Sequence, residues 1–153
     1  MEVTKMTIFF DMDGTLAGLF FVKGFSAMLA EGNMAPYIEA KPLFNTEEMA
    51  SVISALTAKG YEIGIISYAD EANLTAATTA KKAWLAKFFP FASEKNVHIC
   101  TKSTAKTAFM TAGDILVDDA KANREAWEAM GGTTVNAYFR APVKMIDALK
   151  AMI

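Results

Sequence analysis

Short apolar runs alternate with longer amphipathic segments along most of this chain. The apolar runs, at 7–10, 61–66, 96–100, 114–117 and 133–138, have the length and the β-branched or aromatic content of buried parallel strands. The remaining segments predict helices at about 45–60, 71–88, 120–130 and from 142 onward, with a short helix between the third and fourth strands. This alternation predicts a three-layer, Rossmann-like α/β fold, in which helices cover both faces of a parallel sheet.

One region, from about 17 to 45, departs from this alternation. It contains many large apolar residues without a helical or strand period, and only a helix at about 24–31 is predicted within it. Because it follows the first strand, it forms an insert at that strand's carboxyl end. Its aromatic residues fit two interpretations: ordinary packing over the sheet, or a small cap that touches a ligand. We treat residues 1–153 as one domain that includes this insert.

The composition of the chain indicates which classes of binding partner and which cellular compartment to expect. The net charge is −2 and the lysines are scattered, which predicts no binding to nucleic acid polymers or anionic membranes. Cys100 and His98 are the only residues of their kinds, which excludes an internal disulfide and a Cys/His zinc site. Residues 16–30 are apolar, but Lys23 and several glycines interrupt them. The start, MEVTK, lacks the basic-then-apolar order of a signal peptide. We therefore expect a soluble, cytoplasmic protein; no oligomeric state is indicated.

The most informative motif follows the first strand, where the sequence reads FFDMDGT. Asp11 and Asp13 emerge at the carboxyl end of this strand, which is where α/β folds place their chemistry. Gly14 permits the backbone to turn immediately afterwards. An acidic strand end is often no more than a solvated loop, but this combination of residues at this place favours a functional site.

Other predicted strands also end in polar residues: Ser67 after the second, Lys102 or Lys106 after the third, and Asp118 with Asp119 after the fourth. The carboxyl ends of parallel strands share one edge of the sheet, so we expect these side chains to meet the first motif. Four clustered carboxylates cannot all stay ionised without a cation, and Mg²⁺ fits oxygen ligands that it shares with a phosphate. One carboxylate can then attack phosphorus and another can protonate the leaving oxygen, while serine and lysine hold the phosphoryl oxygens.

With these motifs the chain resembles the phosphatases of the haloacid dehalogenase superfamily, whose four motifs have counterparts here in the same order within residues 8–119. The resemblance implies that Asp11 is the nucleophile and forms an aspartyl-phosphate, and that Asp13 is the general acid and base. It also implies that Ser67 and a lysine bind the phosphoryl group. The implied ligands of Mg²⁺ are Asp11, Asp13 through its backbone carbonyl, Asp119 directly and Asp118 in the outer shell.

Within that superfamily, residues 113–132, GDILVDDAKANREAWEAMGG, are similar to a segment of the 5'(3')-deoxyribonucleotidases. The spacing from Lys106 to the acidic pair is nearly theirs, which favours Lys106 over Lys102. The resemblance implies a nucleoside monophosphate as substrate, and the residues expected to contact it are Thr15, Ser67, Tyr68, Lys106, Phe21 and Phe25. The insert is shorter than the helical cap of those enzymes, so another small phosphorylated metabolite is an alternative substrate.

A receiver domain that is phosphorylated on aspartate is an alternative of a different class. Such domains also gather acidic residues at a sheet edge and bind Mg²⁺. A receiver, however, carries its acidic pair after the first strand and a lysine after the fifth. This chain has its acidic pair after the predicted fourth strand and no lysine closely after the fifth.

Overall fold

The structure, a computed structural model, describes residues 5–153. Residues 1–4 lie outside the described residues. They make up most of the segment MEVTK, which was compared with a signal peptide above. The strands are β1 Thr7–Phe10, β2 Glu62–Tyr68, β3 Val97–Cys100, β4 Ile115–Asp118 and β5 Thr133–Asn136. The helices are α1 Phe25–Ala30, α2 Ala35–Glu39, α3 Thr46–Ala58, α4 Leu74–Phe88, α5 Lys121–Ala129 and α6 Val143–Lys150. Short 3₁₀ turns lie at Leu19–Phe21, Glu71–Asn73, Glu94–Asn96 and Lys106–Phe109.

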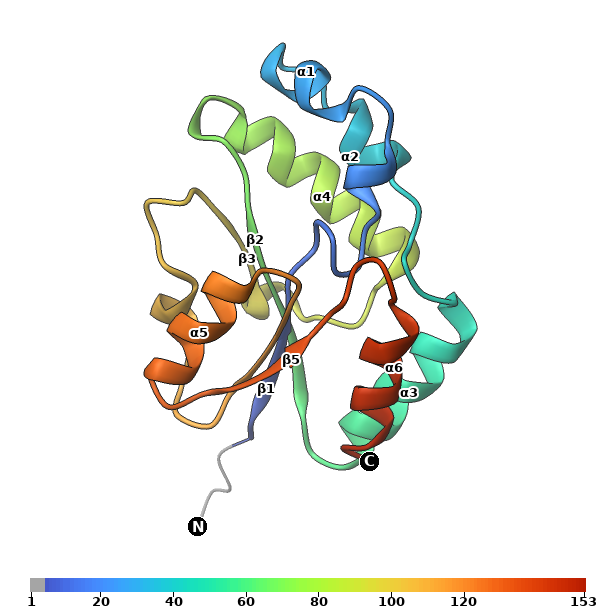
Figure 1. Cartoon of the computed structure of the whole chain (residues 1–153), viewed down its shortest axis with the longest axis vertical. Helices are drawn as coiled ribbons and strands as arrows, with labels where there is room; N and C mark the ends of the chain where they lie inside the picture. Colours follow the sequence, from blue (N-terminus) through green and yellow to red (C-terminus); the bar gives the residue numbers. More distant parts are fainter. Residues whose placement is uncertain (1–4) are drawn as a thin grey trace.

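The five strands form one parallel sheet in the order β3-β2-β1-β4-β5 (Figure 1). This order matches the first five strands of the doubly wound order 3-2-1-4-5-6 and differs from the order 2-1-3-4-5 of receiver domains. The predicted α/β fold class is therefore confirmed, whereas the strand order gives the receiver interpretation no support.

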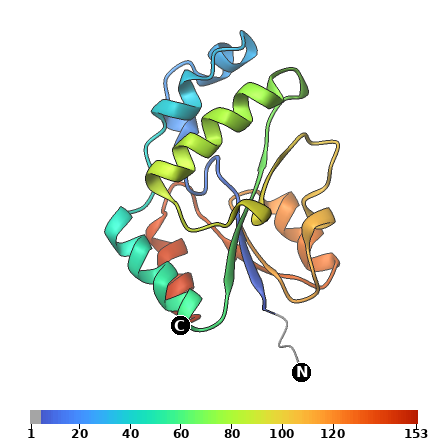
Figure 2. The ribbon, with the colours of Figure 1, turned by 180° about the vertical axis from the view of Figure 1, so that it is seen from behind.

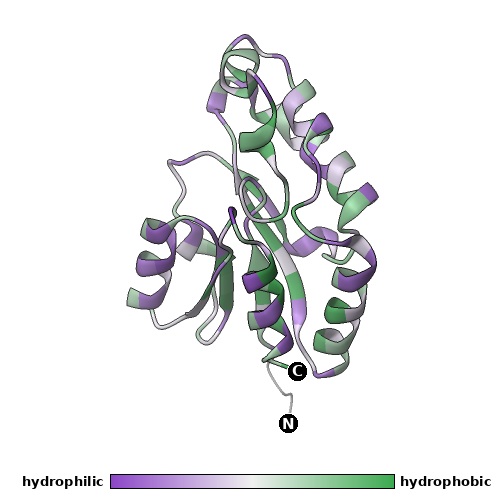
Figure 3. Cartoon of the chain, turned by 45° about the vertical axis from the view of Figure 1, so that its right-hand side comes forward, coloured by the Kyte–Doolittle hydropathy of each residue, from purple (hydrophilic) through white to green (hydrophobic). Residues whose placement is uncertain are grey.

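Alternating side chains of β1 serve the two faces of the sheet. Ile8 and Phe10 are fully buried in the larger core, to which α3, α4 and α6 contribute. Phe9 points to the other face, where it packs with Ile66, Leu116 and Trp127 of α5. Figure 2 shows the helices on both sides of the sheet, and Figure 3 shows largely apolar strands between helices that carry both hydrophilic and hydrophobic residues. Both faces of the sheet are thus covered, as the sequence predicts.

The predicted helices and strands agree with the structure, apart from differences at the ends of some of them and in the type of one short helix. Asn45 caps α3 as expected, because its side chain accepts a hydrogen bond from the Glu48 N–H at 2.9 Å. The predicted helix at 71–88 begins as a 3₁₀ turn before α4 starts at Leu74. The predicted short helix between the third and fourth strands is the 3₁₀ turn Lys106–Phe109.

The insert contains a helix that the sequence pattern did not predict. This helix, α2, spans only five residues and has Pro36 in its first turn, so it is too short to show a period. α1 and α2 lie beyond the carboxyl edge of the sheet, beside α4 (Figure 1). Two hydrogen bonds join the insert to α4 and the turn before it: Trp84 Nε1 donates to the Ala40 carbonyl at 2.7 Å, and Asn73 Nδ2 to the Leu29 carbonyl at 3.2 Å.

Across residues 5–153, no helix has both the length and the apolar character that crossing a bilayer requires.

Candidate active site

The carboxyl ends of β1 and β4 bring two of the predicted acidic residues together. Phe10 pairs with Val117 in the sheet, and the Asp11 N–H donates to the Val117 carbonyl at 2.9 Å, so Asp11 leaves β1 beside Asp118, the last residue of β4. Gly14 then turns the chain at a φ of 82°. A β-carbon on Gly14 would lie 2.6 Å from Asp119 Oδ2, so this turn also needs a glycine for space.

Lys106 joins the two neighbouring strand ends electrostatically. Its Nζ donates to Asp11 Oδ1 at 2.8 Å and to Asp118 Oδ2 at 2.9 Å, and its side chain is only 3% exposed. Burial alone would lower the pKa of Lys106, but the negative charges of Asp11 and Asp118 raise it above its ordinary value. The alternative lysine, Lys102, is exposed on the loop after β3. The structure therefore brings Lys106, and not Lys102, to the carboxylates.

Asp118 is fully buried, and both of its carboxylate oxygens are engaged by protein groups. Oδ1 accepts from the Ala120 N–H at 2.9 Å, and Oδ2 accepts from Lys106 and, at 3.0 Å, from Asn123 Nδ2. Burial and the nearby charge of Asp11 raise the pKa of Asp118, while Lys106 acts in the opposite direction. Asp118 therefore fixes the position of the Lys106 ammonium group and of the start of α5 through these hydrogen bonds.

Asp119 lies in a different environment, next to Asp11, and the hydroxyl group of Thr15 contacts both carboxylates. Thr15 Oγ1 is 3.3 Å from Asp11 Oδ2 and 3.2 Å from Asp119 Oδ1, and it accepts from the Asp119 N–H at 3.2 Å. Burial and the charge of Asp11 raise the pKa of Asp119 to about 8. Thr15 is itself fully buried. Its hydroxyl therefore lies between the two carboxylates, and the contact of Thr15 with a substrate stays a prediction.

Three carboxylates of the site could provide oxygen ligands for a divalent cation. Asp11, Asp118 and Asp119 each offer a carboxylate oxygen, and these three oxygens lie within 4.8 Å of one another. Oxygen donors of this kind suit a hard cation such as Mg²⁺. Burial first, and then the neighbouring charges of Asp11 and Asp118, raise the pKa of Asp119, so the ionised form of this carboxyl is disfavoured where it lies. The donor set fits the predicted Mg²⁺.

Asp13 and Ser67, the other predicted catalytic residues, meet at a lysine that the sequence analysis missed. Lys81 of α4 is fully buried, and its Nζ lies 3.0 Å from Asp13 Oδ2 and 2.7 Å from Ser67 Oγ. Ser67 lies inside β2, is fully buried, and turns its hydroxyl oxygen to Lys81. A signal for Lys81 did exist, since it shares the buried stripe of α4 with Ala77 and Trp84 at helical spacing.

The aromatic residues predicted to contact a substrate are spread over different places. The Tyr68 ring centroid lies 5.2 Å from Lys106 Nζ, beside the carboxylates. Phe25 packs on Phe20, and Phe20 is the ring at the site, because its Cε2 would lie 2.6 Å from a β-carbon on Gly14. Phe21 is 66% exposed.

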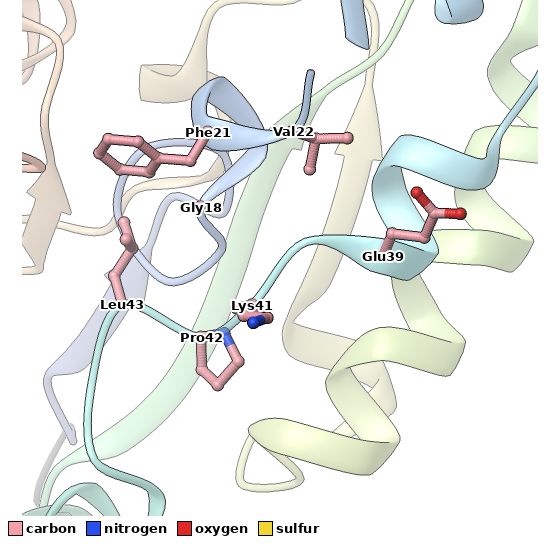
Figure 4. A pocket seen from close by; sticks show the side chains of 7 residues that line it. All are labelled: Gly18, Phe21, Val22, Glu39, Lys41, Pro42 and Leu43. Atoms are coloured by element: carbon pink, nitrogen blue, oxygen red, sulfur yellow. The ribbon is translucent and has the colours of Figure 1, made fainter. Parts of the chain in front are cut away.

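Phe21 lines a pocket of about 480 Å³ that lies within the insert. Figure 4 shows this pocket between the segment with Gly18 and Val22 and the segment from Glu39 to Leu43. The carboxylates described above do not line it. This pocket is therefore separate from the acidic site.

No protein-family model matches the sequence, and no curated protein is significantly similar to it. A chain of the Pnkp1/Rnl/Hen1 complex aligns with a TM-score of 0.55 and 18% identity over 88% of this chain and 47% of that chain, so this chain spans about half of its length. D,D-heptose 1,7-bisphosphate phosphatase from Burkholderia thailandensis aligns with a TM-score of 0.49 and 12% identity over 93% and 99% of the two chains. A HAD family hydrolase from Deinococcus radiodurans R1, with bound phosphate and sodium, aligns with a TM-score of 0.48 and 16% identity over 87% and 80%. At these identities the likeness concerns the fold alone.

Proposed function

We propose that this protein is a Mg²⁺-dependent phosphomonoester hydrolase that works through an aspartyl-phosphate. The observation that carries the proposal is the position of Lys106, which holds the first acid of the DMDGT motif and the end of β4 together at 2.8 and 2.9 Å. A buried cation beside a carboxylate offsets the negative charge of a phosphoryl group that the carboxylate attacks. The resemblance of the motifs to those of haloacid dehalogenase phosphatases supports the same chemistry.

Two displacements at phosphorus make up the proposed reaction. A carboxylate oxygen of Asp11 attacks phosphorus, the bond from phosphorus to the ester oxygen breaks, and Asp13 gives its proton to the departing alcohol. The Asp13 carboxylate then takes a proton from a water molecule whose oxygen attacks the same phosphorus. The bond between phosphorus and Asp11 breaks, which releases inorganic phosphate and restores both acids. Throughout, Lys106 stays beside Asp11 and offsets the charge of the phosphoryl group.

Asp11, Asp119 and the backbone carbonyl of Asp13 are the groups that we propose hold Mg²⁺. Asp118 is placed in the outer shell because hydrogen bonds from Lys106, Asn123 and the Ala120 N–H already engage its oxygens. When bound, Mg²⁺ offsets negative charge on the carboxylates and on the phosphoryl oxygens.

For the substrate we propose a nucleoside monophosphate. The Phe20 ring stands against Gly14 at the acidic site, and it packs on Phe25 and Phe139 at centroid distances of 5.7 and 5.6 Å. Phe20 remains 43% exposed, so part of its ring is free to contact a ligand. A base stacked on an aromatic ring gains about 1 to 3 kcal/mol.

Steady-state hydrolysis with and without Mg²⁺ tests the reaction. Asp11→Asn should lower kcat by at least about a thousandfold, because the substitution preserves shape and removes the nucleophile. Asp147→Asn is the matched control, since Asp147 is exposed on α6, and its activity should equal that of the wild type. More than about a tenth of wild-type turnover in Asp11→Asn would exclude the aspartyl-phosphate.

Substrate choice is tested by comparing kcat/KM for thymidine, deoxyuridine and guanosine monophosphates with that for glucose 6-phosphate. We expect the nucleotides to be preferred, and Phe20→Ala to lower their kcat/KM by about fivefold or more, from the stacking energy above. Phe21→Ala is the neighbouring control and should leave the preference unchanged. A preference for the sugar phosphate, or an equal effect of the two substitutions, would refute the nucleotide proposal and leave a phosphatase of another metabolite.

A further inference from the structure

Lys81 is a buried cation whose donors are all used within the protein. Its ammonium group donates to Asp13 Oδ2 at 3.0 Å, to Ser67 Oγ at 2.7 Å and to the Tyr68 carbonyl at 2.6 Å. An ammonium group has three N–H bonds, so none remains for a substrate. The Tyr37 ring of the insert covers the ammonium group, with its centroid 4.6 Å from Nζ.

This arrangement is not needed for the packing of α4. The stripe around position 81 is apolar, and a buried ion pair is commonly no more stable than a well-packed apolar side chain in its place. Asp13 is the only carboxylate bonded to Lys81 among the described residues, and the Asp13 side chain is 20% exposed. Lys81 therefore reaches, from the interior, a carboxylate that is partly open to solvent.

The hydrogen bond to Ser67 has a defined direction. Lys81 can only donate, so Ser67 Oγ accepts, and the full burial of Ser67 keeps this contact dry. With Ser67 and the Tyr68 carbonyl fixed on β2, the position of the ammonium group is fixed relative to the sheet. The one carboxylate oxygen that it binds, Asp13 Oδ2, is then held in place, and the other oxygen is left without this contact.

We infer that Lys81 is a positioning residue that holds the carboxylate of Asp13 in one orientation for proton transfer, with Tyr37 of the insert confining the ammonium group. Ser67 in this arrangement serves as an anchor for Lys81. The inference rests on the proposed function, because it assigns to Asp13 the proton given to the leaving alcohol. It adds a residue to the site that does not itself touch the substrate.

Leaving groups of different acidity separate this role from a purely structural one. A general acid matters greatly for a poor leaving group, such as the alcohol of glycerol phosphate, and little for p-nitrophenolate. Lys81→Met should therefore lower kcat/KM for glycerol phosphate about 10- to 100-fold and for p-nitrophenyl phosphate less than about threefold. Lys82→Met is the matched control, because Lys82 is the next residue and pairs with Glu94 on the surface. It should leave both values unchanged.

A double substitution keeps the test valid if Lys81→Met folds poorly. Asp13→Asn with Lys81→Met removes both charges of the pair, and circular dichroism reports whether it folds. If Lys81 acts through Asp13, the double variant should be within about twofold of Asp13→Asn in kcat/KM for glycerol phosphate. A further loss of tenfold or more, or equal losses for the two substrates in Lys81→Met, would overturn the inference while the proposed function stands. Wild-type protein that hydrolyses neither of these substrates and no nucleoside monophosphate with Mg²⁺ would overturn both.

Discussion

Replacing Lys106 by methionine removes the cation between two strand ends without a large change in side-chain volume. Two charged hydrogen bonds are lost, and the side chains of Lys106, Asp118 and Asp11 are only 3%, 0% and 12% exposed. Removing one partner of a buried ion pair costs about 3 to 5 kcal/mol, because the remaining charge stays in the interior. In a domain of this size that corresponds to a fall in Tm of about 6 to 20 °C. Activity should also be lost, because in the proposed reaction Lys106 offsets charge on the phosphoryl group.

Urea unfolding followed by circular dichroism measures this loss. Lys102→Met is the matched control: Lys102 is exposed, so its substitution should change the free energy of unfolding by no more than about 0.5 kcal/mol. Adding Asp118→Asn to Lys106→Met removes one of the carboxylates left behind, and it should recover part of the stability. Excess Mg²⁺ should narrow the gap to wild type by replacing the missing positive charge. A loss below about 1 kcal/mol in Lys106→Met, or the same loss in Lys102→Met, would show that the buried cation does not hold the strand ends.

Two further predictions concern Asp119 and Gly14. The pKa of Asp119, raised to about 8 in the folded protein, lies above its unfolded value, so the unfolded state binds fewer protons and stability should fall as pH rises from about 4 to 8. Without Mg²⁺ the Tm should decline over this range. Excess Mg²⁺ and Asp119→Asn should each make the decline smaller, and an undiminished decline in Asp119→Asn would assign it to another group. Gly14→Ala should cost at least about 1 kcal/mol more stability than Gly24→Ala, and should weaken Mg²⁺ binding measured by calorimetry. Both glycines have positive φ, but only at Gly14 would the added carbon meet neighbouring atoms, at 2.6 Å; equal losses would remove the steric argument.

The fold class and the edge at which the acidic residues gather could be predicted because both depend on local signals. Apolar runs of strand length, separated by amphipathic helices, specify a parallel sheet, and a parallel sheet places the ends of its strands together. Asp11 directly follows such a run, and Asp118 is the last residue of another. Their meeting then needs only that β1 and β4 be neighbours, which the structure shows.

Lys81 could not be assigned to Asp13 in the same way, because their meeting depends on how α4 packs over the sheet. A lysine within a helix is usually solvated, and only the full stripe from Ala77 to Leu85 indicates that position 81 faces inward. The sequence pattern also could not predict that the Phe20 side chain points to the site. The segment around it has no period that would fix which side chain points to the site.

The two lysines divide the charges of the site between two separate groups of residues. Lys106 bonds to Asp11 and Asp118, and Asp119 has an oxygen within 4.8 Å of theirs. Three carboxylates and one ammonium group leave two negative charges when all three acids are ionised. One divalent cation neutralises that remainder. Asp13 has a cation of its own in Lys81, so its carboxylate is not needed to balance this group. In the proposed reaction, such a division would leave Asp13 for proton transfer while Asp11 and Asp119 hold the cation and Asp118 lies in its outer shell, because charges within one cluster titrate together.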